Sequence, residues 1–188
     1  MKDLSLETNR LVLREFNELD WQAVHEYASD PQVVRYMTWG PNTKKESQGF
    51  VQRAIARQQE EPRRNYEFAV VLKTEDRLIG GCGINISNPG DQGGWIGYCF
   101  NRHFWGQGYA TETARTLLVF GFSQLKLHRI FATCDTKNIA SAGVLEKIGM
   151  RREGHLREYE WVRGKWRDSF LYAILDYEWK ALRVRSRG

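Results

Sequence analysis

Three strand-like segments follow one another closely in the middle of this chain. The first two, YEFAVVLK (66–73) and RLIGGCGINI (77–86), are joined by only three residues, a spacing typical of a hairpin. A loop is predicted over SNPGDQGG (87–94), and a third strand over WIGYCFN (95–101). Consecutive strands with such short links favour antiparallel pairing, because parallel neighbours need a long crossover connection. The sequence therefore predicts an antiparallel meander at the centre of the fold.

The segments on either side of the meander complete an α/β pattern. Before it, alternation at 11–16 predicts a strand, and helices are predicted over 18–30 and from Thr43 to about Glu61, the second with a capping box completed by Glu46. After it we predict a helix following the loop at 105–112, a strand at 129–135, a short helix at 138–148, and a hairpin of strands at 155–162 and 165–175. The fold class is therefore α/β, with a mixed, mostly antiparallel sheet of about seven strands. One domain is expected over residues 1–180, with a basic tail at 181–188.

Composition places the chain among globular proteins. Its 188 residues are 41% hydrophobic and 27% charged, and no apolar run approaches the roughly 20 residues of a membrane span. The N-terminal segment MKDLSLETNR has no apolar stretch typical of a secretory signal, so we expect a cytoplasmic protein without a membrane partner. The three unclustered cysteines predict buried thiols, with neither a disulfide framework nor a zinc site.

A net charge of +5 suits a polyanionic partner, either a nucleic acid or a phosphorylated nucleotide. Charge alone does not choose between them. Since the chain has no zinc pattern and no RNP-like motif, nucleic acid is not expected.

The loop WGQGYATE (105–112) is the strongest local signal for a ligand. It follows a predicted strand and precedes a predicted helix, whose first N–H groups have no intrahelical partner. Gly106 and Gly108 would let the backbone approach a phosphate closely, although a plain connection has the same pattern. A dinucleotide fold is disfavoured because Thr111 replaces the third glycine and a meander precedes the loop. A Walker loop is excluded by the absence of GK[ST].

Four segments together resemble the GNAT acetyltransferases. They are ETNRLVLREF (7–16), LIGGCGI (78–84), IGYCFNRHFWGQGYATE (96–112) and NIASAGVLEKIGMRREG (138–154). The resemblance is closer to the RimJ/RimL-like branch, which contains the ribosomal-protein N-terminal acetyltransferases, and it spans nearly the whole chain in the same order. It implies a GNAT-type sheet flanked by helices and splayed between its fourth and fifth strands, 95–101 and 129–135. Acetyl-CoA would lie in the split, with no metal.

The resemblance also implies which residues hold acetyl-CoA. The loop would surround the pyrophosphate, the end of the strand at 95–101 would pair with pantetheine, and the helix at 138–148 would approach the sulfur. The implied residues are Cys99, Phe100, Asn101, Gly106, Gln107, Gly108, Tyr109, Ala110, Thr111, Asn138 and Ser141. Asn138 is equally well explained as the N-cap of its helix. The chain departs from many GNAT proteins at Trp105, where an Arg or Gln is common.

The catalytic groups are less clear from the sequence. Leu145 stands where many GNAT proteins have a tyrosine acid, so Ser141 is the expected partner of the leaving thiolate. Trp95 stands where relatives often have a glutamate base. Glu112 matches a recurrent family glutamate and is named as a candidate catalytic residue, although a carboxylate at a helix N-terminus is also favoured by the helix dipole.

The acceptor site is expected between the segment holding Tyr36 and Trp39 and the C-terminal hairpin. On that hairpin Asp168 is named as a substrate-binding residue, and Glu160 is a further carboxylate; either could instead pair with a neighbouring arginine. The expected function is transfer of acetyl from acetyl-CoA to a primary amine, an α-amine of a protein N-terminus or a small amino compound. The alternatives are a non-catalytic acyl-CoA-binding module and, more remotely, a nucleic-acid-binding protein. A homodimer is left open.

Overall fold

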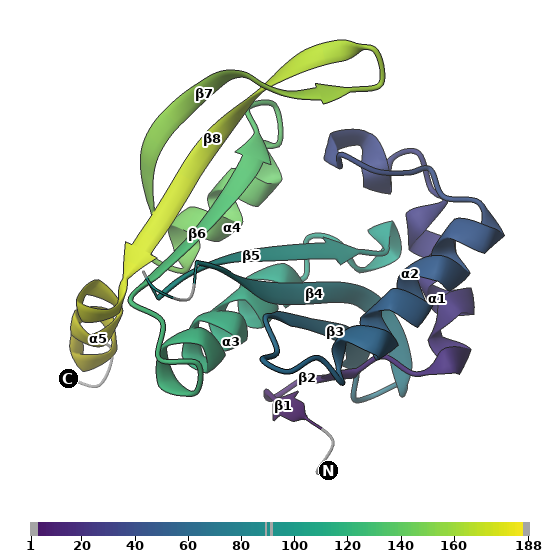
Figure 1. Cartoon of the computed structure of the whole chain (residues 1–188), viewed down its shortest axis with the longest axis horizontal. Coiled ribbons are helices and arrows are strands. Elements are labelled where there is room, and N and C mark those ends of the chain that lie inside the picture. The colour runs from purple at the N-terminus through teal and green to yellow at the C-terminus, as the bar shows by residue number, and fades with distance from the viewer. Residues whose placement is uncertain (1–3, 89, 91, 186–188) are drawn as a thin grey trace.

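The computed structural model describes residues 4–88, 90 and 92–185 of the chain (Figure 1). The strands are β1 (Ser5–Glu7), β2 (Leu11–Glu15), β3 (Asn65–Leu72), β4 (Arg77–Asn88), β5 (Gly93–Phe100), β6 (Arg129–Asp135), β7 (Arg151–Val162) and β8 (Lys165–Leu175). The α-helices are α1 (Trp21–Ala28), α2 (Lys44–Arg57), α3 (Tyr109–Ser123), α4 (Ile139–Lys147) and α5 (Asp176–Arg185), and short 3-10 helices are η1 (Glu18–Asp20), η2 (Val33–Tyr36) and η3 (Arg102–Phe104). None of the described helices is long and apolar enough to span a membrane.

All the strands join one sheet of order β1-β2-β3-β4-β5-β6-β8-β7. Every neighbouring pair is antiparallel except β5 and β6. These two pair in parallel only between 93–95 and 129–131, after which they separate. Figure 1 shows β6 and the long β7–β8 hairpin leaving the plane of the β1–β5 half. The predicted fold class and the split between 95–101 and 129–135 are thus confirmed, with β1 as an eighth strand beyond the expected seven.

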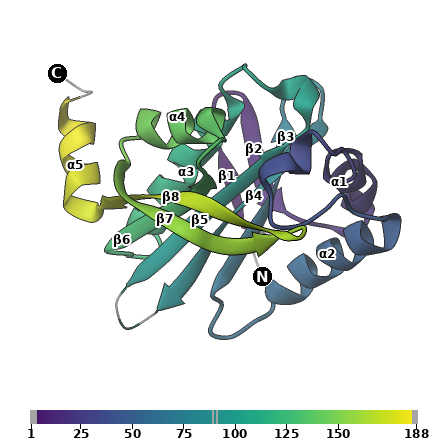
Figure 2. The same cartoon turned by 90° about the horizontal axis from the view of Figure 1, so that it is seen from above.

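Two apolar clusters lie on opposite faces of the sheet. One joins β2–β5 to α3 and α4 through residues such as Leu117 and Leu145, and the other joins the sheet to α1 and α2 through Val24 and Val51. Figure 2 shows the two helix pairs on different sides of the strands. The helices therefore fix the β1–β5 half from both faces, while the outer part of the β7–β8 hairpin extends beyond them (Figure 1).

The predicted capping box of α2 is present. The backbone N–H of Thr43 donates to the Glu46 carboxylate at 2.7 Å, and the Thr43 hydroxyl accepts from the Glu46 N–H at 3.3 Å. The helix ends at Arg57 and not near Glu61, because the following residues form i→i−3 bonds, as in Glu60 N–H to the carbonyl of Arg57 at 3.3 Å. The first predicted helix likewise ends early, at Ala28.

Other observed elements differ from the predicted ones because distant segments of the chain pair or pack with each other. The predicted loop 87–94 is shorter, because β4 continues to Asn88 and β5 begins at Gly93. The backbone of Gly93 pairs with both β4 and β6. Residues 89 and 91 of this loop lie outside the described residues. Strand β7 begins at Arg151, earlier than expected. The predicted tail 181–188 is helical through Arg185, as the end of α5, whose Trp179 stacks on Phe122 with ring centroids 6.2 Å apart.

Candidate active site

A cleft of about 1280 Å³ opens where β5 and β6 separate. It is lined by parts of β4, β5, β6 and α4, by the segment from Tyr36 into α2, and by the β7–β8 hairpin. Of the residues named from the sequence, it brings together Cys99, Asn138, Ser141, Tyr36 and Trp39. The loop 106–111, Phe100, Asn101, Glu112 and Asp168 do not line it. Among the described residues, no group of three or more His, Cys, Asp or Glu side chains is placed to hold a metal ion.

The glycine loop lies between the end of β5 and the start of α3. Gly106 and Gly108 have φ angles of +76° and +83°, a left-handed conformation that favours glycine. A Cβ on Gly106 would meet no atom within 4 Å, so the space beside the loop is open. Gly108 is the N-cap of α3 and provides no side-chain cap. The first N–H groups of this helix are therefore available to an anion, with the helix dipole favouring negative charge.

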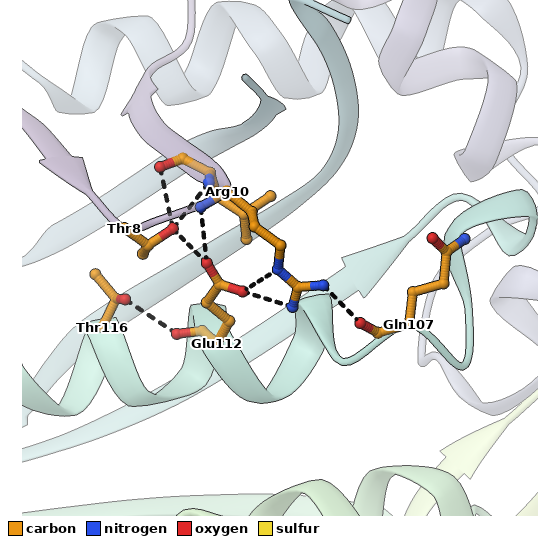
Figure 3. A network of polar contacts seen from close by, with 6 residues as sticks. Thr8, Arg10, Gln107, Glu112 and Thr116 are labelled. Atoms are coloured by element: carbon orange, nitrogen blue, oxygen red, sulfur yellow. Dashed lines mark hydrogen bonds and ion pairs between the residues drawn. The ribbon is translucent and has the colours of Figure 1, made fainter. Parts of the chain in front are cut away.

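The carboxylate of Glu112 fastens the start of α3 to the β1–β2 edge (Figure 3). It accepts from the Thr8 hydroxyl at 2.6 Å and from the Nε of Arg10 at 2.7 Å, and Arg10 also donates to the carbonyl of Gln107 at 2.9 Å. The same guanidinium lies 4.5 Å from the centroid of the Tyr109 ring. Partial burial raises the pKa of Glu112, but the hydrogen bonds from Thr8 and Arg10 outweigh it, and the pKa lies below its usual value. These contacts position the loop.

Two side chains fix the end of β5 against the loop. The indole Nε1 of Trp105 donates to the carbonyl of Phe100 at 2.9 Å, and Asn101 caps η3 by accepting from the His103 N–H at 3.1 Å. Trp105 thus joins the start of the glycine loop to the end of β5. The sequence showed only that Trp105 departs from the family pattern, and it did not predict the hydrogen bond from Trp105 to Phe100.

The free edge of β5 faces the split. The N–H of Asn101 donates to the carbonyl of Ile79 in β4 at 2.9 Å. Because N–H directions alternate along a strand, those of Tyr98 and Phe100 point to the opposite edge, toward β6. The pairing with β6 has ended at Trp95. This edge can therefore bind an extended amide-containing ligand as an added strand.

Ser141 lies at the start of α4 and meets a tyrosine of β5. Asn138 is the N-cap of α4 and accepts from the Ser141 N–H at 3.1 Å, so its capping role is confirmed. The Ser141 Oγ is 3.1 Å from the Tyr98 hydroxyl, and both residues line the cleft. Burial raises the pKa of Tyr98 far above its usual value, so this phenol stays protonated. Sequence reasoning missed Tyr98 because its partner comes from an element 43 positions away.

Asp168 supports an irregular stretch of β7. Its carboxylate accepts from the Glu158 N–H at 2.9 Å and lies 2.7 Å from the Nε2 of His155. Both contacts lower the pKa of Asp168, and the hydrogen bond from the Glu158 N–H has the larger effect. Glu158 has a φ of +49°, and the register of β7 and β8 shifts between Leu156 and Glu160. Such bulges re-aim side chains, and the residues that follow, Tyr159 and Glu160, line the cleft.

Among the carboxylates that line the cleft, Glu160 differs from the rest. Glu46 is held by its capping box, Glu67 lies 3.0 Å from Arg57, and Asp135 lies 3.7 Å from Arg167. Burial raises the pKa of Glu67, and Arg57 only partly offsets it. Within the described part of the chain, no hydrogen bond or ion pair engages the half-buried Glu160 side chain. Glu67 also has one buried oxygen without a hydrogen-bond partner, while Arg57 engages the other oxygen. Glu160, with neither oxygen engaged by a described residue, can accept a proton from a ligand.

In this protein two strands of the sheet separate beside a glycine loop and a helix N-terminus that has no side-chain cap. This arrangement defines a class of proteins that hold an extended, phosphate-bearing ligand between two strands. Residues 10–151 match the family described as the acetyltransferase (GNAT) domain. The chain belongs to this family and is an N-acetyltransferase, with a fold that binds acetyl-CoA.

Relatives and solved structures agree with this family. The uncharacterized N-acetyltransferase YnaD of Bacillus subtilis is 40% identical over 176 residues, which cover 94% of this chain and 99% of its own. The [ribosomal protein uS5]-alanine N-acetyltransferase of Escherichia coli is 24% identical over 181 residues, 93% of this chain and 92% of its own.

Among crystal structures, a GNAT acetyltransferase from Bacillus anthracis is 37% identical with a TM-score of 0.82, covering 93% of this chain and 99% of its own. Two more distant structures share the fold. The ribosomal L7/L12 α-N-protein acetyltransferase RimL, in complex with CoA, is 20% identical with a TM-score of 0.82 and covers 92% of this chain and 99% of its own. A spermidine N-acetyltransferase from Vibrio cholerae, in complex with CoA and spermine, is 21% identical with a TM-score of 0.79 and covers the same shares.

Proposed function

We propose that this enzyme transfers the acetyl group of acetyl-CoA to an α-amine, on a protein N-terminus or on a small amino compound, by direct attack of the amine on the thioester. The observation that carries the proposal is the convergence of Ser141, Tyr98 and the unpaired carboxylate of Glu160 on one cleft, at the split of the sheet. That cleft offers a group for the leaving sulfur and a group for the proton of the amine.

The cofactor contacts in the proposal divide into backbone and side-chain parts. The N–H groups of 106–111 bind the pyrophosphate, and the β5 edge from Cys99 to Asn101 binds the pantetheine amides. Asn138 lines the cleft beside this edge and contacts the same arm. Glu112 acts by holding the loop, since its carboxylate is already engaged by Thr8 and Arg10. We therefore propose a positioning role for Glu112 in place of a base.

The reaction forms one bond and breaks one. The neutral amine nitrogen attacks the thioester carbon, the new C–N bond forms, and the C–S bond breaks. Glu160 accepts the proton that the nitrogen loses. The N–H of Phe100 or Tyr98 stabilises the oxygen that gains charge. The Ser141 hydroxyl, paired with Tyr98, donates a hydrogen bond to the leaving thiolate, which takes its proton from solvent; a serine is far less acidic than a thiol of pKa about 8.5, so Ser141 is not a strong acid.

The choice of an α-amine rests on protonation. An α-amino group has a pKa of about 8 and a lysine side chain one of about 10.4, so near pH 7.5 the neutral α-amine is more abundant by on the order of a hundredfold. A carboxylate removes a proton less readily from a cationic amine than a stronger base would, so the enzyme works better on the amine that is more often neutral. The name of RimL, an α-N-protein acetyltransferase, agrees with this choice, and the uS5 enzyme is named for an alanine of a ribosomal protein. The spermidine N-acetyltransferase is the reason to include small polyamines in the panel.

The test is a thiol-release assay with acetyl-CoA and a panel of peptides and polyamines. Peptides that carry both a free N-terminus and an internal lysine are then analysed by mass spectrometry. We expect the acetyl group mainly on the N-terminus. Acetylation mainly on lysine would refute the α-amine proposal and leave the acetyltransferase assignment intact.

A further inference from the structure

The turn of the β7–β8 hairpin is bound to the segment between α1 and α2. The Nη2 of Arg163 shares its two hydrogens among three backbone carbonyls, those of Val34 at 3.2 Å, Trp39 at 2.6 Å and Gly40 at 2.7 Å. Its Nε gives Gly40 a further hydrogen bond of 3.1 Å. These residues are separated by more than 120 positions in the sequence, and the contacts, called here the Arg163 bridge, join the hairpin turn to the segment before α2.

Both partners of the bridge also form walls of the cleft. Tyr36, Trp39 and Gly40 line it from one side, and Tyr159 and Glu160 line it from the hairpin. In Figure 1 the hairpin and the segment before α2 extend toward each other above β5. The bridge therefore connects the two walls at a point beyond the helices that cover the sheet.

The local backbone makes each end of the bridge well defined. Arg163 and Gly164 have φ angles of +49° and +77°, and Val162 pairs with Lys165, which together describe a two-residue hairpin turn. At the other end Gly40 has a φ of +73°, and a Cβ there would lie 2.9 Å from Val34. Only glycine fits without displacement, so the carbonyls that accept from Arg163 have a fixed direction. A planar guanidinium can serve several such acceptors at once, and a lysine ammonium matches them less well.

We propose that Arg163 is a positioning residue for the acceptor: by holding the two walls together it determines how tightly the acceptor amine binds, without contacting acetyl-CoA. This rests on the proposed function, in which the acceptor enters between these walls. Without the bridge the two walls lose the hydrogen bonds that join them here, and the acceptor would have to order them relative to each other on binding, which lowers its affinity. The cofactor edge of β5 and the glycine loop are not part of the bridge.

The experiment compares Arg163→Ala with Lys165→Ala, which removes a cation from the same turn but no contact of the bridge. With saturating acetyl-CoA and the best acceptor of the panel, we expect the acceptor KM of Arg163→Ala to rise about tenfold, because charge-assisted hydrogen bonds between the walls are lost, and kcat to fall by a smaller factor, because Glu160 lies on the same wall. The acceptor KM of Arg163→Lys should lie between those of Arg163→Ala and Lys165→Ala. The increase in melting temperature given by acetyl-CoA should be the same in all of them.

A second readout does not depend on turnover. Hydrogen exchange at the amides of 34–42 and of the hairpin turn should be faster in Arg163→Ala than in Lys165→Ala. Equal exchange in the two variants overturns the bridge, and an unchanged acceptor KM, or an equal loss of acetyl-CoA binding, overturns the positioning role. A wild-type protein that acetylates no amine in the panel would instead count against the proposed function, while the exchange measurement would still decide the bridge.

Discussion

The regions proposed to bind the cofactor and the acceptor are built from different kinds of structure. The region proposed for the cofactor offers mainly backbone groups: the free edge of β5 in the cleft and, outside the cleft, a glycine loop and a helix N-terminus without a side-chain cap. On the acceptor side, the walls are irregular segments held by side chains, Arg163 on three carbonyls and Asp168 on the Glu158 N–H. The difference indicates that backbone groups of the fold can bind a ligand that stays constant, whereas a ligand that varies is bound by loops that side-chain contacts hold in place.

The largest effect is expected from Gly108→Asp on the cofactor side. A carboxylate beside the pyrophosphate should lower acetyl-CoA affinity at least about a hundredfold and abolish the increase in melting temperature that acetyl-CoA gives the wild type. Gly108→Asn is the matched control, because asparagine tolerates a positive φ and has nearly the same shape without charge. Equal binding by the Asp variant and the wild type would refute the loop as the pyrophosphate site.

The next effect concerns Ser141, where the two sides meet. Ser141→Ala should lower kcat roughly tenfold to a hundredfold with little change in acetyl-CoA affinity. Tyr98→Phe removes the hydroxyl 3.1 Å away and should lower kcat by a smaller factor. If the pair acts as a unit, the double variant is no worse than Ser141→Ala alone. A fall in affinity without a fall in kcat would make Ser141 a binding residue only.

Glu112→Gln should affect stability more than chemistry. Loss of the charged contacts to Thr8 and Arg10 is expected to lower the unfolding free energy by about 1–3 kcal/mol, or the melting temperature by a few degrees. The folded pKa of Glu112 is lowered, so its contribution is present above the unfolded pKa and is lost as the pH falls through the folded value. The difference in melting temperature between variant and wild type should therefore shrink as the pH falls below the unfolded pKa of about 4.3, and continue to shrink until the pH is below the folded pKa.

Glu7→Gln is the control for this prediction, because the exposed Glu7 pairs with Lys73 at the surface and its loss should change stability very little. A normal melting temperature for Glu112→Gln combined with a large fall in kcat would return Glu112 to the catalytic role named from the sequence.

The smallest effect is expected from Asp168. Asp168→Ala removes both acceptors that hold the bulge of β7 and should lower kcat/KM for the acceptor by roughly threefold to tenfold, since Glu160 is less well positioned. Asp168→Asn keeps an oxygen that can accept from the Glu158 N–H, so its kcat/KM for the acceptor should fall less than that of Asp168→Ala. Binding of acetyl-CoA should be equal in both. A loss above a hundredfold would indicate that Asp168 contacts the acceptor directly, as the sequence suggested.

Much of the framework was predictable because it depends on neighbours in the chain. The strands at 129–135 and 165–175 have the predicted bounds, and the Thr43–Glu46 box and the glycine loop are present, since period, capping and turn chemistry are local properties. Helix α5 was missed because its partner Phe122 lies in α3. Gly93 was assigned to a loop because a glycine gives no side-chain pattern even when its backbone pairs on both edges.

By itself the sequence predicted most of the elements in their order and the glycine loop before α3, since periodicity, glycine positions and helix termini act over a few residues. The family and the place where the sheet separates were implied by the resemblance of four segments to the GNAT acetyltransferases. The tertiary structure alone decided that Tyr98 meets Ser141, that Glu112 holds Arg10, that Asp168 supports a bulge and that Arg163 joins two walls. Each of these contacts joins groups on different elements or segments, and such contacts depend on how whole elements pair and pack, which no local pattern specifies.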